Sequence, residues 1–220
     1  MPMPSLTKGA GSIIRDGIYI IANVKADPDT AAEAKLVFDP QGLVVKAVAA
    51  RRDADTAAIE SGALLVRRLS TAQEAVVALG IKAFGHFGSR TAPEYLRLFP
   101  VAPSTLVAAS TAARTAGFAA LAKALASPDL PKELAASASA VTAAYAALDA
   151  AAAADATATE ALRQAVAAEK AAADAWHTAV RTLRGRLIML FPRDAKRVTS
   201  YFPPRKRAAK AAKVTPVAPQ

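Results

Sequence analysis

The sequence predicts an all-α protein, an elongated helical bundle of two tandem repeats that each hold a short helix and a long coiled-coil-like helix. Three observations predict this fold class. Hydrophobic residues make up 53% of the 220-residue chain but aromatic residues only 5%, so alanine, the strongest helix former, supplies much of the apolar content. Proline-containing turns recur at an interval of about 100 residues. Between these turns, apolar residues return every three or four positions, which is the period of an amphipathic helix.

The repeat is visible in the turns and at the ends of the two halves. Pro28, in an Asp-Pro-Asp step, matches Pro128, in a Ser-Pro-Asp step, at an offset of 100 residues. The Phe-Pro pair at Phe99 matches the pair at Phe202 at an offset of 103, and a three-residue insertion reconciles the two offsets. The expected regions are a flexible N-terminus at 1–11, a first repeat at 12–103, a second repeat at 104–203 and a disordered basic tail at 204–220.

Each repeat is expected to begin with a short helix, at 12–26 in the first repeat and at 104–126 in the second. The Asp27-Pro28-Asp29 and Ser127-Pro128-Asp129 steps are predicted to start the next helix, because Asp or Ser supplies an N-cap oxygen and proline fits the first turn. Thr30-x-x-Glu33 has the spacing of a capping box.

The long region of the second repeat contains neither proline nor glycine from Lys132 until Gly185. Steps of four and three residues define fifteen positions, of which twelve are apolar or alanine, as in a coiled-coil seam. These positions are Val141, Tyr145, Leu148, Ala152, Asp155, Thr159, Leu162, Val166, Glu169, Ala173, Trp176, Val180, Leu183, Leu187 and Leu190. We favour one long helix per repeat, with the two long helices antiparallel and the short helices closing the core.

A helical hairpin in each repeat is the alternative to one long helix. Thr157-x-x-Glu160 has the spacing of a capping box in the middle of the second long region. In the first repeat, Gly62 and Ser70-x-x-Gln73 lie in the middle as well. The seam keeps its phase across Asp155, which a hairpin turn has no reason to preserve.

The formal charge of +10 is concentrated at the C-terminus. The last sixteen residues hold no acidic residue and five basic ones, namely Arg205, Lys206, Arg207, Lys210 and Lys213. This segment is too polar to order itself around a core, and its charge attracts polyanions. It resembles the Lys-Ala-Pro tails of linker-histone-like proteins, and the resemblance implies contact with nucleic acid. The alternative is a solubilising tail without a dedicated partner.

The sequence predicts no catalytic residue, no metal site and no cofactor. The absence of cysteine excludes disulfides, thiolate nucleophiles and cysteine-based zinc sites. Asp174-x-x-His177 has the spacing of a helical carboxylate–histidine metal site, but such sites need a second copy of the motif. We therefore expect His177 at the solvent edge or at an interface. Glu160 and Arg163 are expected on a solvated helix face.

Three glycines, Gly80, Gly85 and Gly88, invite comparison with a phosphate-binding loop. They lie inside a helical pattern instead of after a strand, and no Gly-Lys-Ser/Thr follows them, so we interpret them as points of close helix–helix contact. Gly88 is also suited to end the helix. Phe84 and Phe87 have core-facing spacing and are assigned to the core.

These observations favour a non-enzymatic interaction or scaffolding protein that associates with itself or with a partner protein through its helical surfaces. Its basic tail is expected to contact acidic surfaces. The alternative is a nucleic-acid-associated protein of low specificity, bound to DNA or RNA through the tail. We expect a cytoplasmic protein, because the N-terminal sequence shows no apolar signal core and the chain has no cysteine. We expect no membrane insertion, because the most apolar stretch, 138–154, is mostly alanine and carries Asp149.

Overall fold

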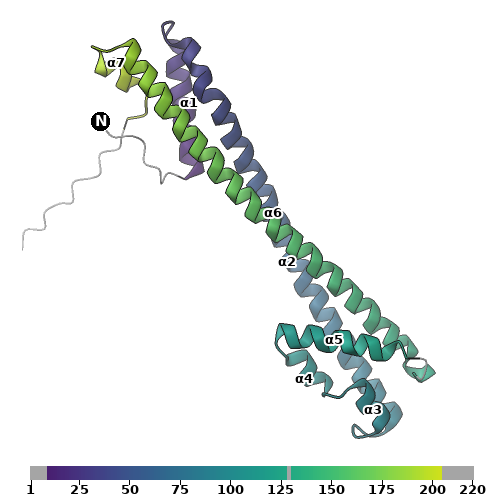
Figure 1. Ribbon diagram of the computed structural model, residues 1–220. Helices are drawn as coiled ribbons and strands as arrows, with labels where there is room; N and C mark the ends of the chain where they lie inside the picture. Colours follow the sequence, from purple (N-terminus) through teal and green to yellow (C-terminus); the bar gives the residue numbers. More distant parts are fainter. Residues whose placement is uncertain (1–8, 128–129, 205–220) are drawn as a thin grey trace, which may run out of the picture. The chain divides into compact units, whose positions relative to one another are not determined.

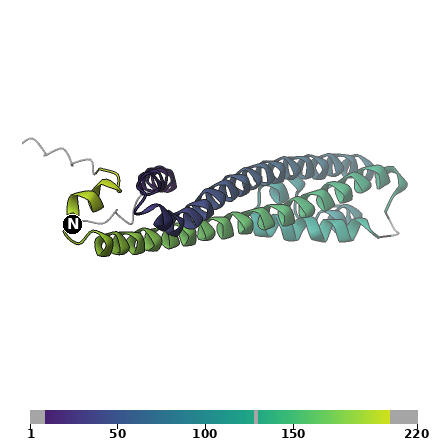
Figure 2. The same cartoon turned by 90° about the horizontal axis from the view of Figure 1, so that it is seen from above.

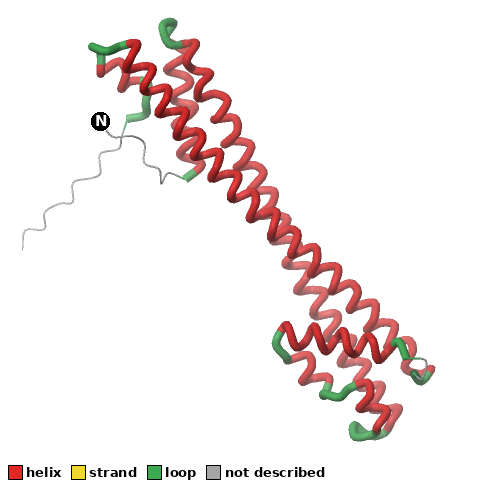
Figure 3. The backbone as a smooth tube through the Cα atoms, viewed as in Figure 1, coloured by secondary structure: helices red, strands yellow, loops and turns green. Residues whose placement is uncertain are grey.

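The computed structural model describes residues 9–127 and 130–204. These residues form helices and no strand, so the predicted all-α class is confirmed (Figure 3). The elements are α1 (Ala10–Ala26), the 3-10 helix η1 (Ala31–Ala34), α2 (Lys35–Phe87), α3 (Pro93–Leu98), α4 (Pro103–Ala108), α5 (Thr111–Leu125), α6 (Lys132–Leu190) and α7 (Ala195–Ser200) (Figure 1).

The chain divides into two compact units, and each long helix contributes to both of them. Unit 1 contains the described residues up to Arg51 and from Ala165 onward, and unit 2 contains Arg52–Gln164. Unit 1 therefore combines α1, η1, the start of α2, the end of α6, and α7. Unit 2 combines the rest of α2, α3, α4, α5 and the start of α6.

The core of unit 1 forms where α1, α2, α6 and α7 meet. Within this unit α2 and α6 run antiparallel, because Arg51 pairs with Glu169 at 3.1 Å while the earlier Glu33 pairs with the later Arg186 at 3.0 Å. The buried residues are Ile13, Ile20, Val24, Ala34, Val37, Val44, Trp176, Val180, Leu183, Leu187, Val198 and Tyr201.

The core of unit 2 forms between the second part of α2, the first part of α6, and the short helices α3 and α5. Both views of the ribbon show these parts of α2 and α6 side by side (Figures 1 and 2). The buried residues are Ala72, Val76, Leu79, Ala83, Tyr95, Leu98, Phe99, Phe118, Leu121, Leu125, Leu134, Ala138 and Val141. Closer to the end of the unit, the Ser61 hydroxyl donates a hydrogen bond to the Asp155 carboxylate at 3.0 Å.

Each long helix is continuous, so the hairpin alternative is wrong. α2 has 53 residues and α6 has 59. The residues that suggested a new helix start lie inside a regular helix: the Thr157 hydroxyl donates to the Ala153 carbonyl, one turn back, and the Ser70 hydroxyl donates to the Glu74 carboxylate. Both are ordinary hydrogen bonds between neighbours on a helix face.

The seam of α6 differs in part from the predicted positions. Val180 and Leu183 are buried and Leu162 is half-buried, as expected, but Val166 is 45% exposed and Leu190 is 49% exposed. Between residues 151 and 166, every second predicted position is exposed and the residue before it faces inward instead. These inward residues are all alanine, namely Ala151, Ala158 and Ala165. Small side chains allow closer packing, which explains why alanine faces inward and Val166 outward.

The Asp27-Pro28-Asp29 step is not a helix start, contrary to the prediction. Asp27 ends α1, the step forms a turn, and α2 begins only at Lys35 after η1. The Thr30 hydroxyl donates to the Val24 carbonyl at 2.9 Å and so does not cap the following helix. The capping box is therefore absent. The Ser127-Pro128-Asp129 step lies partly outside the described residues, and α6 begins at Lys132.

The short helix expected at 104–126 is divided into α4 and α5. The chain between them is extended at Ala109, with a ψ of 161°. This break lets α4 fold back on α5, where the Leu106 side chain packs so closely on Gly117 that a Cβ there would lie 2.2 Å from it. A single straight helix could not make this contact.

Candidate protein-interaction surface

The part of α2 in unit 2 carries a row of exposed side chains without any charge. Spacings of four, three, four, seven, four and three residues place them on one face of the helix. The members of this row, which we call the α2 stripe, are Ile59, Ala63, Val66, Ser70, Val77, Ile81 and Phe84. Val66 is 69% exposed, Ile81 67% and Ile59 66%. The α2 stripe is therefore an apolar face in contact with solvent.

The α2 stripe lies on the far side of the helix from its core face. In the same segment, Val76, Leu79 and Ala83 are at most 1% exposed and belong to the core of unit 2. A surface helix normally has one apolar face and one polar face. This helix has two apolar faces, and only one of them is covered within the described residues. An exposed, largely apolar surface of this kind is typical of an interaction site; Glu74, which accepts a hydrogen bond from Ser70, interrupts it between Ser70 and Val77.

The long helix α6 offers an internal comparison. Many of its buried positions coincide with those of η1 and α2 when the first parts are shifted by 100 residues and the later parts by 104, although Ala138 and Ala151 are buried where Phe38 and Arg51 are exposed. The buried pairs are Ala34 and Leu134, Gln41 and Val141, Val76 and Val180, Leu79 and Leu183, and Ala83 and Leu187. The positions on α6 that correspond to the α2 stripe are Thr159, Arg163, Val166, Asp174, Arg181, Gly185 and Ile188, and all are exposed. Three of them are charged, so charge is compatible with this face, and its absence is particular to α2.

Charged residues follow one flank of the α2 stripe. Glu60, Arg67, Glu74 and Lys82 are all exposed, and their spacing places them on the same side of the row. The sign alternates from acidic to basic along this flank. Charges beside an apolar row determine which partners fit it and in which direction.

Phe84 belongs to the α2 stripe, and its assignment to the core is wrong. It is 43% exposed, and the Arg90 guanidinium lies over its ring at 5.4 Å. Phe87 is half-buried and packs against the core of unit 2, as predicted. The core face of this turn includes Ala83 and Phe87, which leaves Phe84 outside. The α2 stripe was not predicted from the sequence, because the spacing of apolar residues does not show which of them are exposed.

The three glycines of α2 and its end have different roles. A Cβ at Gly80 would lie 2.4 Å from Pro103 Cγ, so this glycine permits the predicted close contact. Gly85 faces open space, and the prediction for it is wrong. Gly88 has a φ of +69°, and its amide donates to the Phe84 carbonyl at 2.9 Å, so it ends α2 as predicted.

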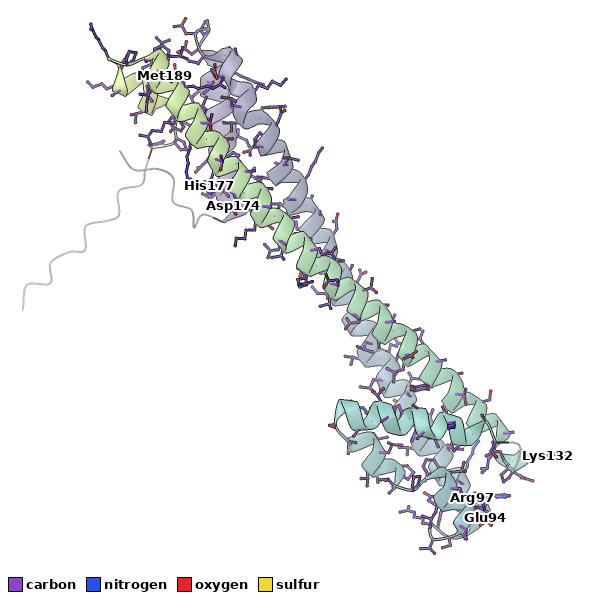
Figure 4. The ribbon with its side chains drawn as sticks, in the orientation of Figure 1. Glu94, Arg97, Lys132, Asp174, His177 and Met189 are labelled. Carbon is purple, nitrogen blue, oxygen red and sulfur yellow. The ribbon has the colours of Figure 1, made fainter. Side chains whose placement is uncertain are left out.

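His177 is buried, so of the two expected positions, the solvent edge and an interface, the first is wrong. It is 5% exposed, and its ring lies edge-on to Trp176 with 5.1 Å between the centroids. Figure 4 shows the positions of Asp174 and His177 on α6. Among the described residues, no three His, Asp or Glu side chains are grouped so that they could hold a metal ion.

Two other side-chain pairs are exposed. The His86 Nδ1 atom lies 4.0 Å from the Glu133 Oε2 atom. Glu160 and Arg163 form an exposed ion pair at 2.8 Å, as predicted for a solvated face.

A polar cluster in unit 1 joins α7 to the turn after α1. Arg197 donates to the Asp27 carboxylate at 2.7 Å and to Asp29 at 2.7 Å, and the Tyr201 hydroxyl also donates to Asp27. The Tyr201 and Arg197 hydrogen bonds lower the pKa of Asp27, and burial of Tyr201 with its bond to Asp27 raises the pKa of that phenol. Arg197 also lies over the Phe191 ring at 3.9 Å. These four polar groups are hydrogen-bonded to one another, which is consistent with a structural role.

A cavity of about 230 Å³ lies in unit 2, beside α3. Its walls include Phe87, Leu98 and Leu130, and its charged lining residues are Glu94 and Arg97, both labelled in Figure 4. Ser127 supplies a hydroxyl group to the same lining.

The predicted polyanion-binding residues Arg205, Lys206, Arg207, Lys210 and Lys213 lie outside the described residues. By length and composition alone, α6 is the one described helix with an 18-residue window that could cross a membrane. Alanine supplies most of the apolar residues of α6. The expectation that the chain does not insert into a membrane stays a prediction.

Comparison with protein-family models, with curated proteins and with solved structures finds no match to this chain. The geometry of the chain itself therefore carries the functional argument. Among the features described, the α2 stripe is the one whose exposure is not explained by the fold.

Proposed function

We propose that this chain is a non-enzymatic helical-bundle protein for interaction or scaffolding, and that the α2 stripe is its docking surface. The observation that supports the proposal is the uncharged, exposed row opposite the core face of α2. The polar groups of the cluster in unit 1 are hydrogen-bonded to one another, which is consistent with a structural role for them.

The energy available at this surface sets a requirement on the partner. Fully burying one large aliphatic or aromatic side chain stabilises by roughly 1.5–3 kcal/mol. The five large side chains of the α2 stripe are only 38–69% exposed, so their burial contributes on the order of 5 kcal/mol. Association itself costs an estimated 4–15 kcal/mol. A stable complex therefore needs a partner that brings an apolar row of its own.

The test uses the full-length chain and a matched pair of substitutions. Val66→Glu places a charge in the α2 stripe, and Val166→Glu places the same charge at the corresponding exposed position of α6. We expect Val66→Glu to abolish association and Val166→Glu to preserve it. Association is measured by co-purification, either of other proteins or of a second, differently tagged copy of the chain. Equal association of the natural chain and both variants would contradict the proposal.

We also propose that the chain consists of the two tandem repeats at 12–103 and 104–203, each with a coiled-coil-like long helix. The agreement of buried positions in α2 and α6 supports this. So does the order of elements, because each long helix is followed by a short helix, α3 or α7, and then by a Phe-Pro pair. The burial pattern favours an offset of 104 for Phe87 and Phe191, one residue more than the Phe-Pro pairs indicate.

Low-specificity binding to nucleic acid is the second candidate function. It is favoured by the five basic residues between Arg205 and Gln220, which account for half of the formal charge of +10. Contact of all five with phosphates predicts a log–log slope of affinity against salt of about −4 to −5. Binding of DNA and RNA by the full chain and by a chain that ends at Pro204 tests this. Equal binding by both proteins, without salt dependence, would rule out the tail.

A further inference from the structure

We propose that the partner of the α2 stripe is the α2 stripe of a second copy of this chain, packed antiparallel about a twofold axis level with Thr71 and Ala72. The inference rests on the proposed function, because it names the occupant of that docking surface. Its support comes from the spacing of the apolar residues, the charges on the flank, and the number of such stripes in the chain.

Four of the five large apolar residues of the α2 stripe, all except Ile81, have the same spacing in both directions. Ile59, Val66, Val77 and Phe84 follow one another at intervals of seven, eleven and seven residues. When a second copy runs in the opposite direction about the stated axis, Ile59 faces Phe84 and Val66 faces Val77. The small residue Ser70 lies close to the axis, where the two helices come nearest. A surface of this kind is complementary to itself, as a twofold interface requires.

The charges on the flank match in the same arrangement. A twofold axis keeps the flank of one helix beside the same flank of the other. Arg67 then lies within two positions of Glu74 of the second copy, and Glu60 within one position of Lys82. In a parallel pair, the twofold axis runs along the helices and places this flank of one helix beside the opposite flank of the other, so these four residues do not pair with one another. Charge therefore favours the antiparallel direction.

The α2 stripe covers residues 59–84, a length of about 38 Å along a helix. The corresponding face of α6 carries Arg163, Asp174 and Arg181, so α6 does not repeat the α2 stripe. One self-complementary surface per chain closes after two copies and does not propagate into a filament. The expected assembly is a dimer.

Light scattering with size-exclusion chromatography measures the assembly directly. We expect twice the chain mass of 22.6 kDa for the full-length protein. Val66→Glu should raise the dimer dissociation constant by about tenfold or more, because a charge would be buried between apolar rows. Val166→Glu should leave it unchanged. The thermal unfolding midpoint of Val66→Glu controls for folding, since Val66 is largely exposed.

A charge exchange tests the direction of the two helices. Arg67→Glu alone should weaken the dimer severalfold, and Arg67→Glu combined with Glu74→Arg should restore it. These two residues are seven positions apart, about 10 Å along one helix, so they do not form the usual ion pair between adjacent turns of one chain. Failure of the double variant to restore the dimer would overturn the antiparallel arrangement.

The outcomes separate this inference from the proposed function. A chain that stays at 22.6 kDa at its highest soluble concentration overturns the dimer. If Val66→Glu then still removes other co-purifying proteins, docking at the α2 stripe stands with a different occupant. A dimer that Val66→Glu does not weaken overturns both.

Discussion

At the level of single residues, the glycines of α2 separate a close contact from an open surface. Gly80 and Gly85 lie in the same helix, five residues apart, and both have ordinary helical backbone angles. At Gly80 a Cβ meets the rigid ring of Pro103, whereas at Gly85 it meets nothing within 4 Å. Substitution by alanine at the two positions therefore separates the cost of a clash with Pro103 from the gain in helix propensity.

We expect Gly80→Ala to destabilise the protein by about 1–3 kcal/mol, because α4 has to move away from α2. Gly85→Ala should stabilise it by up to about 1 kcal/mol, because alanine is the better helix former and has room for its methyl group. Urea denaturation followed by circular dichroism gives both free energies of unfolding. Equal effects at the two positions would show that α4 does not constrain Gly80.

At the level of helices, the attachment of α7 depends on the charge of Asp27. Its pKa is lowered from the ordinary value of 3.8 by the Tyr201 hydroxyl and by Arg197. A lowered pKa in the folded state contributes stability above the ordinary value, and this contribution is lost as the pH falls below 3.8 through the folded value. Tyr201 behaves oppositely: its raised pKa contributes stability below pH 10 that is lost as the pH rises above 10.

We expect Asp27→Asn to be less stable than the natural chain at pH 7, with a difference that shrinks as the pH falls toward 2. Trp176, the single tryptophan, lies in the same core as Val198 and Tyr201, so its fluorescence reports the unfolding of unit 1. Denaturation midpoints from pH 7 to pH 2 give the measurement. Asp39→Asn, on exposed surface of the same unit, is the control. A constant difference across this range would show that the Asp27 charge is not involved.

The long helices could be predicted from sequence, while their ends and exact faces could not. The absence of proline and glycine after Lys132 and the constant phase of the seam were sufficient for α6. The role of Asp27 was missed because its partner, Arg197, is 170 residues away and no local pattern reveals it. The inward face of α6 was misplaced by one residue because alanine occurs on every side, so two neighbouring registers fit the apolar pattern.

The docking surface was missed for a related reason. Phe84 and Phe87 are both compatible with an apolar face, and periodicity alone does not show that a helix has two such faces. The position of α4 and the core face at Ala83 decide which of them is covered. The tertiary packing around α2 determines which of its faces are covered, so the exposure of the α2 stripe can be recognised only in the structure.

At the level of the whole molecule, stability is divided between two separate cores. The buried cluster of unit 1 and that of unit 2 have no residue in common, although α2 and α6 contribute to both. Residues that pack in one contiguous core tend to unfold together as a cooperative unit. Hydrogen exchange distinguishes such units, because each opens at its own free energy. The residues of α2 and α6 outside both clusters, such as Ala54 and Ala58, bury less apolar surface. Their amides should exchange fastest among those of the long helices.

Reciprocal core truncations test whether the two cores open separately. Trp176→Ala removes a fully buried side chain from unit 1 and should cost about 3–5 kcal/mol, and Leu79→Ala removes one from unit 2 and should cost about 2–5 kcal/mol. Hydrogen exchange with mass spectrometry should show lost protection in α1, α7 and the end of α6 for Trp176→Ala. For Leu79→Ala, the loss should lie in α3, α5 and the start of α6. If either variant lowers protection evenly along the chain, the long helices couple the two cores into one cooperative unit, and the division of stability proposed here is wrong.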